Sequence, residues 1–506
     1  MLAVARTVAF EGVEARLVET QCVLSPGLPA FHVVGLPDKA VSESRERVRA
    51  ALSSLSIALP PKRITVNLSP ADLPKEGSHF DLPIALALLA ALGVIPAEEL
   101  ARTVSLGELS LDGRLVPVVG ALPAAMAAAG EDCALICPRG CGAEAAWVGA
   151  AQVFAPASLL EAIHHLTSQS PLPRALPGEV TQSANARDLA DVKGQERAKR
   201  ALEIAAAGRH HVFMVGSPGS GKSMLAARMS GILPPLSPTE ALETSMIHSL
   251  AGLLDEGGIS RQRPFREPHH TASVAAIVGG GRGAKPGEIS LAHNGVLFMD
   301  EFPEFPRTVL ETLRQPIETG EVVVARANAH TRYPCRFLLV AAANPCKCGY
   351  MAEPARACAR VPACGAEYLG RISGPLMDRF DLRVEVPPVA YSDLDLPQSG
   401  EGSAQVAARV AGARARQNTR FAAHDGLIVN ADAEGAVLDE ISAPDPEGRA
   451  LLAQVAERFG LSARGYHRIL RVARTIADLE ASETVRLPHV AEAVSFRLSF
   501  GPDTRE

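Results

Sequence analysis

The sequence predicts an α/β protein whose central unit is a mostly parallel sheet built around a phosphate-binding loop. Three observations support this fold class. A complete G-x4-G-K-[ST] motif lies between a short apolar run and a helix-like segment, which is the context that such a loop requires. Two later apolar runs also end in polar side chains, and strand-like and helix-like segments alternate through residues 188–390. Alternation of this kind places helices on the faces of a parallel sheet.

The composition of the 506-residue chain indicates about two to four domains. Charged residues make up 21% and the net charge is −6, which excludes a general polycation and restricts any nucleic-acid contact to local patches. Nine cysteines, without a secretory signal pattern, indicate a reducing cytoplasm rather than a disulfide scaffold. The longest apolar run, at 82–94, is too short to span a bilayer and predicts a buried helix, so no membrane partner is expected.

The chain divides by composition into four parts. The first part alternates strand-like runs, such as 63–67 and 115–119, with helices rich in alanine and leucine. A linker rich in serine and proline follows, then the alternating core, then a mainly helical segment. The predicted boundaries are 1–165, 166–187, 188–390 and 391–506.

The phosphate loop is the strongest functional signal in the sequence. The apolar run 211–215 precedes it and the helix-like run 224–228 follows it, so backbone N–H groups at a helix N-terminus would face the phosphates of a nucleoside triphosphate. Lys222 is expected to reach the β- and γ-phosphates, and the Ser223 hydroxyl to bind Mg²⁺. The residues predicted to hold the nucleotide are Gly216, Ser217, Pro218, Gly219, Ser220, Gly221, Lys222 and Ser223.

Two adjacent acids follow the apolar run 296–299. We expect Asp300 to bind Mg²⁺ together with Ser223, and Glu301 to polarise the attacking water. Acid pairs after apolar runs are common, so this interpretation depends on the phosphate loop in the same alternating segment.

Two further residues are candidates for catalysis. Asn344 follows the apolar run 337–343 and can orient water against the γ-phosphate, although an asparagine before proline is also an ordinary turn former. Arg379 lies in a short loop at 374–381. An arginine supplied by a neighbouring subunit can stabilise the charge that develops during phosphoryl transfer, and a surface salt bridge is the alternative role.

These motifs occur in the order found in AAA+ ATPases: Asp-Val-Lys-Gly-Gln at 191–195, the phosphate loop, Asp300-Glu301, Asn344 and Arg379. Three other segments are more specific, namely Arg-Glu-Pro-His-His-Thr-Ala-Ser at 266–273, Gly-Glu-Ile-Ser-Leu-Ala-His-Asn-Gly at 287–295 and Arg-Ile-Ser-Gly-Pro at 371–375. Through them the chain resembles, over nearly its whole length, the magnesium-chelatase-like AAA+ ATPases of the ComM/YifB family.

The resemblance implies an AAA+ core with a helical lid, assembled as a hexameric ring with ATP sites between subunits. It implies that Arg379 acts on the neighbour's nucleotide. It also implies that Arg464 is the second sensor in the lid, with Arg468 and Arg471 one and two turns further along the same predicted helix.

The same resemblance makes residues 1–165 a Lon-protease-like domain of the ribosomal S5-type fold. In that alignment His79 replaces the nucleophilic serine and Leu122 lies near the position of the lysine. Ser78 is adjacent, but a serine nucleophile needs a base within hydrogen-bond reach. Peptidase activity is therefore not expected, and the domain would be a scaffold or a DNA-handling collar. Its candidate phosphate contacts are Lys62, Arg63 and Lys75.

Two basic regions of the core suggest DNA as the substrate. Asp300 lies 78 residues beyond Lys222, which leaves room for a glycine-rich basic segment that includes Arg282 and Lys285. A predicted hairpin before the Asn344 strand carries Arg326 and Arg332, and it resembles inserts that grip DNA in related ring helicases. Solvated loops or contacts to a neighbouring subunit are the alternatives for these charges.

Four cysteines could form a zinc site beside Asn344. Cys346, Cys348, Cys358 and Cys364 supply four thiolates within one loop. The Cys-x-Cys half is tighter than the usual finger spacing and the second half is Cys-x5-Cys, so free cysteines remain the alternative.

The function that the resemblance implies is an ATP- and Mg²⁺-dependent hexameric motor that drives branch migration of recombination intermediates during uptake of foreign DNA in natural transformation. Its partners would be single-stranded or branched DNA and further copies of the chain. The alternatives are a metal-chelatase motor subunit and a protein-remodelling ATPase or protease; the N-terminal segment disfavours the first, and the missing serine–lysine pair disfavours the protease.

Overall fold

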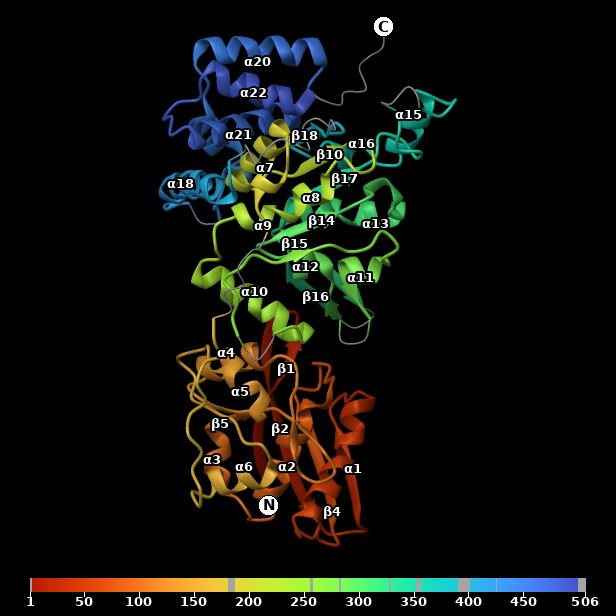
Figure 1. Cartoon of the computed structure of the whole chain (residues 1–506). Coiled ribbons are helices and arrows are strands. Elements are labelled where there is room, and N and C mark those ends of the chain that lie inside the picture. Colours follow the sequence, from red (N-terminus) through yellow and green to blue (C-terminus); the bar gives the residue numbers. More distant parts are fainter. Residues whose placement is uncertain are drawn as a thin grey trace.

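The protein consists of three successive structural regions along its length (Figure 1). The computed structural model describes residues 2–180, 187–254, 258–281, 284–326, 329–351, 356–389, 401–424 and 426–498, with the side chains of 325, 326, 329 and 330 outside that description. The N-terminal region, drawn in red to orange, lies at one end; the phosphate-loop region is central; and the C-terminal helices, in blue, lie at the other end.

The N-terminal region is built on a mixed sheet whose strand order is β3-β4-β2-β1-β5-β8-β9. The long antiparallel pair β1–β2 forms its centre, with Leu2 opposite Val23 and Glu11 opposite Glu14. The strands are β1 (Leu2–Glu11), β2 (Glu14–Ser25), β3 (Ala30–Val34), β4 (Arg63–Ser69), β5 (Thr103–Ser105), β8 (Ala134–Ile136) and β9 (Val153–Phe154). A short pair, β6 (Glu108–Leu109) and β7 (Leu115–Val116), lies apart from it.

Helix α2 (Asp81–Ala91) is the centre of the N-terminal core. All eleven of its residues are buried, so the prediction of a buried helix from the apolar run is confirmed. A helix that is apolar on every face has to be covered all round. The other helices of this region are α1 (Lys39–Ser54), α3 (Ala97–Ala101), α4 (Ala121–Gly130), α5 (Arg139–Ala145) and α6 (Leu159–Leu166).

The central region contains a five-stranded sheet with the order β11-β14-β17-β10-β18. Every neighbouring pair in it is parallel, as the alternating sequence predicts. The strands are β10 (Val212–Val215), β11 (Phe265–Arg266), β14 (Val296–Met299), β17 (Leu338–Ala343) and β18 (Leu382–Glu385). Strands β10, β14 and β17 are buried along their whole length, which explains their continuous apolar sequences.

Helices cover both faces of this sheet. They are α7 (Glu196–Gly208), α8 (Lys222–Ala227), α9 (Met229–Ile232), α10 (Pro238–Ala251), α11 (Val274–Val278), α12 (Glu288–Leu291), α13 (Arg307–Thr312), α14 (Arg314–Thr319), α15 (Ala363–Leu369) and α16 (Gly374–Met377). Two small antiparallel pairs project from the region, namely β12 (Gly279–Gly280) with β13 (Lys285–Pro286), and β15 (Glu321–Arg326) with β16 (Ala329–Pro334).

The β15–β16 pair confirms the hairpin predicted before the Asn344 strand. Its two faces differ. Val322, Val324 and Tyr333 are buried in the core of the central region, whereas Val323 and Arg332, which pair across the strands, are exposed. One apolar face therefore anchors the hairpin and leaves the other face free.

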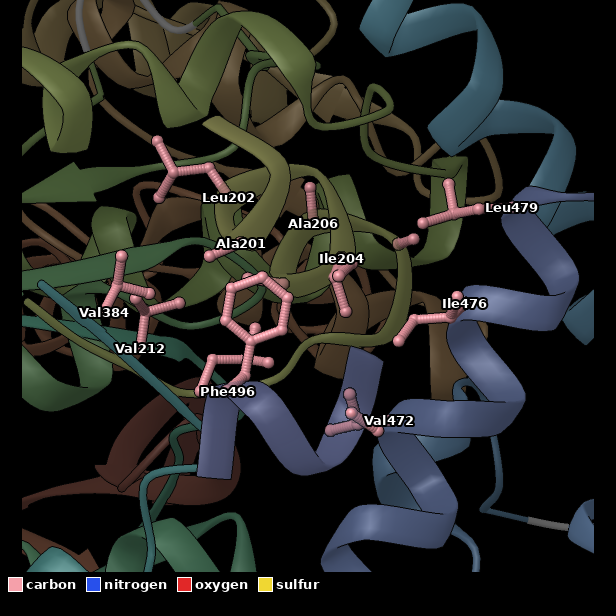
Figure 2. Close-up of a cluster of buried hydrophobic side chains, with 14 of the residues drawn as sticks. Ala201, Leu202, Ile204, Ala206, Val212, Val384, Val472, Ile476, Leu479 and Phe496 are labelled. Carbon is pink, nitrogen blue, oxygen red and sulfur yellow. The ribbon is translucent and has the colours of Figure 1, made fainter. Parts of the chain in front are cut away.

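The C-terminal region is helical, as predicted. Its helices are α18 (Ser403–Phe421), α19 (Gly435–Ser442), α20 (Pro446–Phe459), α21 (Ala463–Leu479) and α22 (Leu487–Leu498). Figure 2 shows the cluster in which this region meets the central one: Ala201, Leu202, Ile204 and Ala206 of α7, Val212, Val384, and Val472, Ile476, Leu479 and Phe496 of α21 and α22. The two regions share one hydrophobic core.

A buried polar network reinforces this joint. Arg468 of α21 donates to Asp381 at 2.6 Å, and His210 contacts Thr475 at 2.8 Å. Burial alone would raise the pKa of Asp381, but the Arg468 guanidinium and His210 outweigh it and hold that pKa well below its ordinary value. Asp381 therefore remains a carboxylate that ties α21 to the central sheet.

The N-terminal region contacts the central region at several places, including the packing of Trp147 on Leu236, Ala241 and Ile259. Glu144 accepts a hydrogen bond from the Leu122 backbone N–H at 3.1 Å and another from the Ser249 hydroxyl of α10. In the β1–β2 turn, Gly12 has a φ of +68° and lies against the backbone of β16, where an added Cβ would be 2.4 Å from the Arg332 carbonyl oxygen. The turn therefore packs directly on the exposed hairpin.

Burial of His79 makes the stability of the N-terminal region depend on pH. Desolvation lowers the pKa of His79 to about 4, against about 6.5 in an unfolded chain. The unfolded state consequently binds more protons between these values, and stability is lost as the pH falls through that window. The expected loss from pH 7 to pH 5 is about 2 kcal/mol.

Urea unfolding followed by the fluorescence of Trp147, the single tryptophan, measures this effect. Wild type and a His79→Leu variant are compared at the two pH values. The variant should lose less stability than wild type on acidification, and an equal loss in both would contradict the assignment.

Candidate functional site

The parallel register of three strands brings the predicted nucleotide residues to one sheet edge. Strand β17 pairs with β10 on one side and with β14 on the other, so the carboxyl ends of all three lie side by side. The phosphate loop follows β10, Asp300 and Glu301 follow β14, and Asn344 follows β17. The Gly216 N–H donates to the Ala343 carbonyl at 3.2 Å and fixes the loop against the neighbouring strand.

The glycines of the loop meet two different requirements. Gly219 and Gly221 have φ values of +78° and +97°, which other residues adopt only with strain. At Gly216 the constraint is space, because an added Cβ would lie 2.2 Å from the Val386 carbonyl oxygen. The loop therefore folds tightly between β17 and the segment after β18.

Lys222 points into this loop and is nearly buried. Its Nζ donates to the carbonyls of Gly216 at 2.7 Å and Ser217 at 3.0 Å, and to Asn344 Oδ1 at 3.2 Å. Desolvation lowers the pKa of Lys222, and the carboxylates of Asp300 and Glu301 oppose that shift. Asn344 thus lies at the loop with the lysine, which a turn-forming role alone does not require.

The acid pair lies on the other side of the loop. Ser223 Oγ donates to Asp300 Oδ2 at 2.6 Å, so the two groups predicted to bind Mg²⁺ are adjacent. The Glu301 N–H donates to Asp300 Oδ1 at 2.8 Å. Glu301 itself has a left-handed backbone, with φ of +50°, and its carboxylate lies 3.0 Å from His270 Nδ1.

The residues present fit a magnesium-bound triphosphate. The Ser220 hydroxyl is buried and, among the described residues, has no hydrogen-bond partner. Lys222 is satisfied by carbonyls that phosphate oxygens could replace. One hydroxyl and one carboxylate are a typical protein contribution to a Mg²⁺ site that shares its ligands with phosphates and water.

Three contacts around the loop were not predicted. Gln195 donates its side-chain amide to the Ser220 carbonyl at 3.4 Å and to the Pro387 carbonyl. Arg228, at the end of α8, donates to Asp191 at 2.9 Å. The motif at 191–195 is visible in the sequence, but its partners come from distant segments.

The His270 contact to Glu301 was also missed. In the sequence this histidine belongs to the family-specific segment 266–273, and only the fold brings that segment beside the acid pair.

The structure holds Arg379 inside the chain. Its guanidinium lies 2.5 Å from Glu318 Oε1 and donates to the Arg314 and Pro375 carbonyls, and the residue is 6% exposed. None of these three partners belongs to the phosphate loop. The neighbour-directed role remains a prediction that requires this arginine to leave Glu318.

Arg464, Arg468 and Arg471 lie in different surroundings on α21. Arg464 is exposed at the beginning of α21, whereas Arg468 donates to the Arg379 carbonyl at 2.9 Å and to Asp381. Arg471 turns to the Ala433 carbonyl and to Glu434. Arg468 thus links the C-terminal helices to the Arg379 loop, and the sensor role of Arg464 remains a prediction.

The candidate DNA contacts are only partly described. Arg282 and the side chain of Arg326 lie outside the described residues. Lys285 on β13 and Arg332 on β16 are both exposed. The Tyr333 hydroxyl donates to the Ala284 carbonyl at 2.8 Å, so the two strand pairs that carry these cations are tied together.

The four cysteines lie close together, since Cys348 also hydrogen-bonds with Cys358, and Cys364 with Cys346. The Sγ atoms of Cys346 and Cys348 are 3.0 Å apart, and those of Cys358 and Cys364 are 3.3 Å apart. Within the described part of the chain, no group of three or more histidine, cysteine or acidic side chains is placed to hold a metal ion. The predicted zinc site therefore lacks support.

In the N-terminal region His79 is buried, and its Nε2 lies 2.9 Å from the Val8 carbonyl oxygen. Ser78 contacts Glu108, and Leu122 is buried at the beginning of α4. Of the candidate phosphate contacts, Lys62 and Arg63 are exposed. The prediction for Lys75 is wrong, because its side chain is fully buried and donates to the Pro70 carbonyl.

None of the helices in the described ranges is both long and apolar enough to cross a membrane.

Comparison with known families gives three matches along the chain. Residues 188–394 match the model "Magnesium chelatase, subunit ChlI". Residues 18–140 match "Subunit ChlI of Mg-chelatase", and residues 400–497 match "Magnesium chelatase, subunit ChlI C-terminal".

Individual relatives match over very different lengths. The chain is 44% identical over 503 residues to the competence protein ComM of Haemophilus influenzae, covering 98% of this chain and 97% of the relative. It is 43% identical over 499 residues to the uncharacterized protein YifB of Escherichia coli, with the same coverage of 98% and 97%. The magnesium-chelatase 38 kDa subunit of Rhodobacter capsulatus is 27% identical over 212 residues, which cover 38% of this chain and 54% of that subunit.

Replacing Glu301 separates nucleotide binding from turnover. A Glu301→Gln variant keeps Lys222, Ser223 and Asp300, so it should bind Mg²⁺-ATP as wild type does. Loss of a general base should lower the hydrolysis rate by about 10²- to 10⁴-fold. Phosphate release and equilibrium binding are measured on the same preparations. Hydrolysis close to the wild-type rate would show that another group polarises the water.

Proposed function

This chain belongs to the ComM/YifB family of magnesium-chelatase-like AAA+ proteins, and we propose that it is an ATP-driven ring motor that acts on DNA. The observation that carries the proposal is the convergence of the phosphate loop, Asp300 and Asn344 on one edge of a parallel sheet. Similarity to ComM over 98% of this chain, against 38% for the R. capsulatus chelatase subunit, supports the ComM-like role over that of a chelatase subunit.

Bound Mg²⁺-ATP would supply the phosphoanhydride bond whose cleavage provides the energy. On binding, Lys222 exchanges the Gly216, Ser217 and Asn344 oxygens for phosphate oxygens. Ser223 and Asp300, whose side-chain oxygens lie 2.6 Å apart, would hold the Mg²⁺ ion. Because these protein groups already lie together, little reorganisation is needed at the moment of reaction.

Glu301 and Asn344 then act on water. Glu301 leaves His270 and accepts a proton from the attacking water. Asn344, once Lys222 has turned to the phosphates, orients that water. Until then, the contact with His270 holds the Glu301 carboxylate away from the water.

The ring and its shared sites are the part of the proposal that rests on family resemblance. In a hexamer Arg379 would leave Glu318 and stabilise charge on the neighbour's nucleotide, as an arginine finger does. Arg468 holds the backbone of Arg379, so movement of the lid is transmitted directly to this residue. Arg464, exposed on the same helix, would serve the nucleotide as second sensor.

The DNA-contacting elements would be the β15–β16 hairpin and the β12–β13 pair. Arg332 and Lys285 are exposed and suited to phosphate contact, which gives affinity without base specificity. Packing of the Gly12 turn on β16 gives the N-terminal region a role as a collar that supports the hairpin.

The competence protein of H. influenzae suggests the biological setting. We infer that the motor moves branch points during recombination of incoming DNA in natural transformation. The alternative is a chelatase-type or protein-remodelling ATPase without DNA activity, which the match to the R. capsulatus subunit favours. That match covers only 38% of this chain.

DNA-stimulated ATP hydrolysis distinguishes these functions. The wild-type rate should rise on addition of single-stranded or branched DNA, and Arg332→Ala should weaken DNA binding equally for all sequences and lower the salt slope by about one. Arg45→Ala, which removes an exposed arginine of α1, is the matched control. Absence of both DNA binding and stimulation would favour the remodelling alternative.

A further inference from the structure

The paired cysteines beside the nucleotide site have no role in the proposed reaction. Cys346 follows Asn344 by two residues, and its Sγ lies 3.0 Å from that of Cys348. Cys346 is fully buried, whereas Cys348 is exposed. A buried thiol therefore lies directly beneath a solvent-accessible one.

Cys348 differs from every other cysteine of the chain. All nine lie in the described part, and Cys348 is the only one that is exposed. Its sulfur hydrogen-bonds with the Cys346 and Cys358 thiols and with the Tyr350 backbone. Cys22 and Cys335, by contrast, are buried. Access to solvent and a thiol in direct contact together favour oxidation of Cys348 to a disulfide.

We propose that Cys348 is a site of reversible oxidation by hydroperoxides, with Cys346 as its resolving thiol. The Cys348 thiolate attacks one oxygen of hydrogen peroxide, the O–O bond breaks, and hydroxide leaves, which forms a sulfenic acid. Cys346 then attacks that sulfur, and the hydroxyl leaves as water with the thiol proton. Each disulfide consumes one peroxide and yields two waters, and a dithiol reductant reverses it by exchange.

The position of the pair connects its oxidation to the nucleotide site. Gly349 packs on the phosphate loop so closely that an added Cβ would lie 2.5 Å from Pro218 Cγ. Asn344, on the other side, contacts Lys222. The segment from Asn344 to Gly349 is therefore fixed at both ends, and closing a disulfide inside it displaces Asn344 or Pro218.

This regulatory consequence rests on the proposed ATPase function, whereas the thiol chemistry does not. A displacement of about 1 Å of a positioning group can cost about 10²-fold in rate. We therefore expect oxidation to lower ATP hydrolysis by about 10- to 100-fold and a dithiol reductant to restore it.

Mass mapping of the full-length protein tests the chemistry. Fully reduced protein is treated with hydrogen peroxide, quenched with an alkylating reagent and digested. A disulfide between Cys346 and Cys348, absent after dithiothreitol, is expected. A disulfide from Cys348 to Cys358, no oxidation at Cys348, or one tightly bound zinc per chain in the reduced protein would each overturn the proposal.

Variants test the link to the nucleotide site. Cys348→Ser should keep its ATP hydrolysis in peroxide, while Cys133→Ser, which removes a buried thiol of the N-terminal region, should be inhibited like wild type. Equal inhibition of Cys348→Ser and wild type would overturn the link. If the reduced wild-type protein hydrolyses no ATP, the proposed function fails, and the disulfide map still decides the thiol proposal.

Discussion

The nucleotide site depends on how the ammonium group of Lys222 is held. Three oxygens from two adjacent strand ends surround it, those of Gly216, Ser217 and Asn344. A desolvated cation without such acceptors would be costly to bury. The parallel register of β10 with β17 brings these acceptors together, so the fold prepares a position that phosphate oxygens can take over. The proximity of Ser223 and Asp300, the proposed Mg²⁺ ligands, follows from the same register through β14.

Features that depend on local sequence could be predicted. The phosphate loop, the buried helix α2 and the β15–β16 hairpin each have a short-range signal, namely a motif, an apolar run and an alternating pattern. The meeting of the phosphate loop, Asp300 and Asn344 at one sheet edge follows from the rule for parallel sheets. Pairings between distant segments carry no such signal. Only the tertiary structure decides which of these side chains become neighbours. Examples are the burial of Lys75, the contact of His270 with Glu301 and the contact of Glu318 with Arg379.

The central region is joined to the regions at both ends of the molecule. On one side α21 shares a hydrophobic core with the central sheet, and Arg468 links Asp381 to the Arg379 backbone. On the other side, the β1–β2 turn at Gly12 packs on the hairpin strand that carries Arg332. Packed cores transmit small displacements because they deform little. These contacts fix the C-terminal helices and the N-terminal region against the central region that carries the nucleotide site.

Equilibrium titration of Mg²⁺-ATP is the most direct measurement of the site that Lys222 defines. Wild type should bind one nucleotide per chain, and Lys222→Ala should show no measurable binding. Lys39→Ala, which removes an exposed lysine of α1, should bind as wild type does. Tight binding to Lys222→Ala, or no binding to wild type, would contradict the assignment of the loop at 216–223 as the nucleotide site.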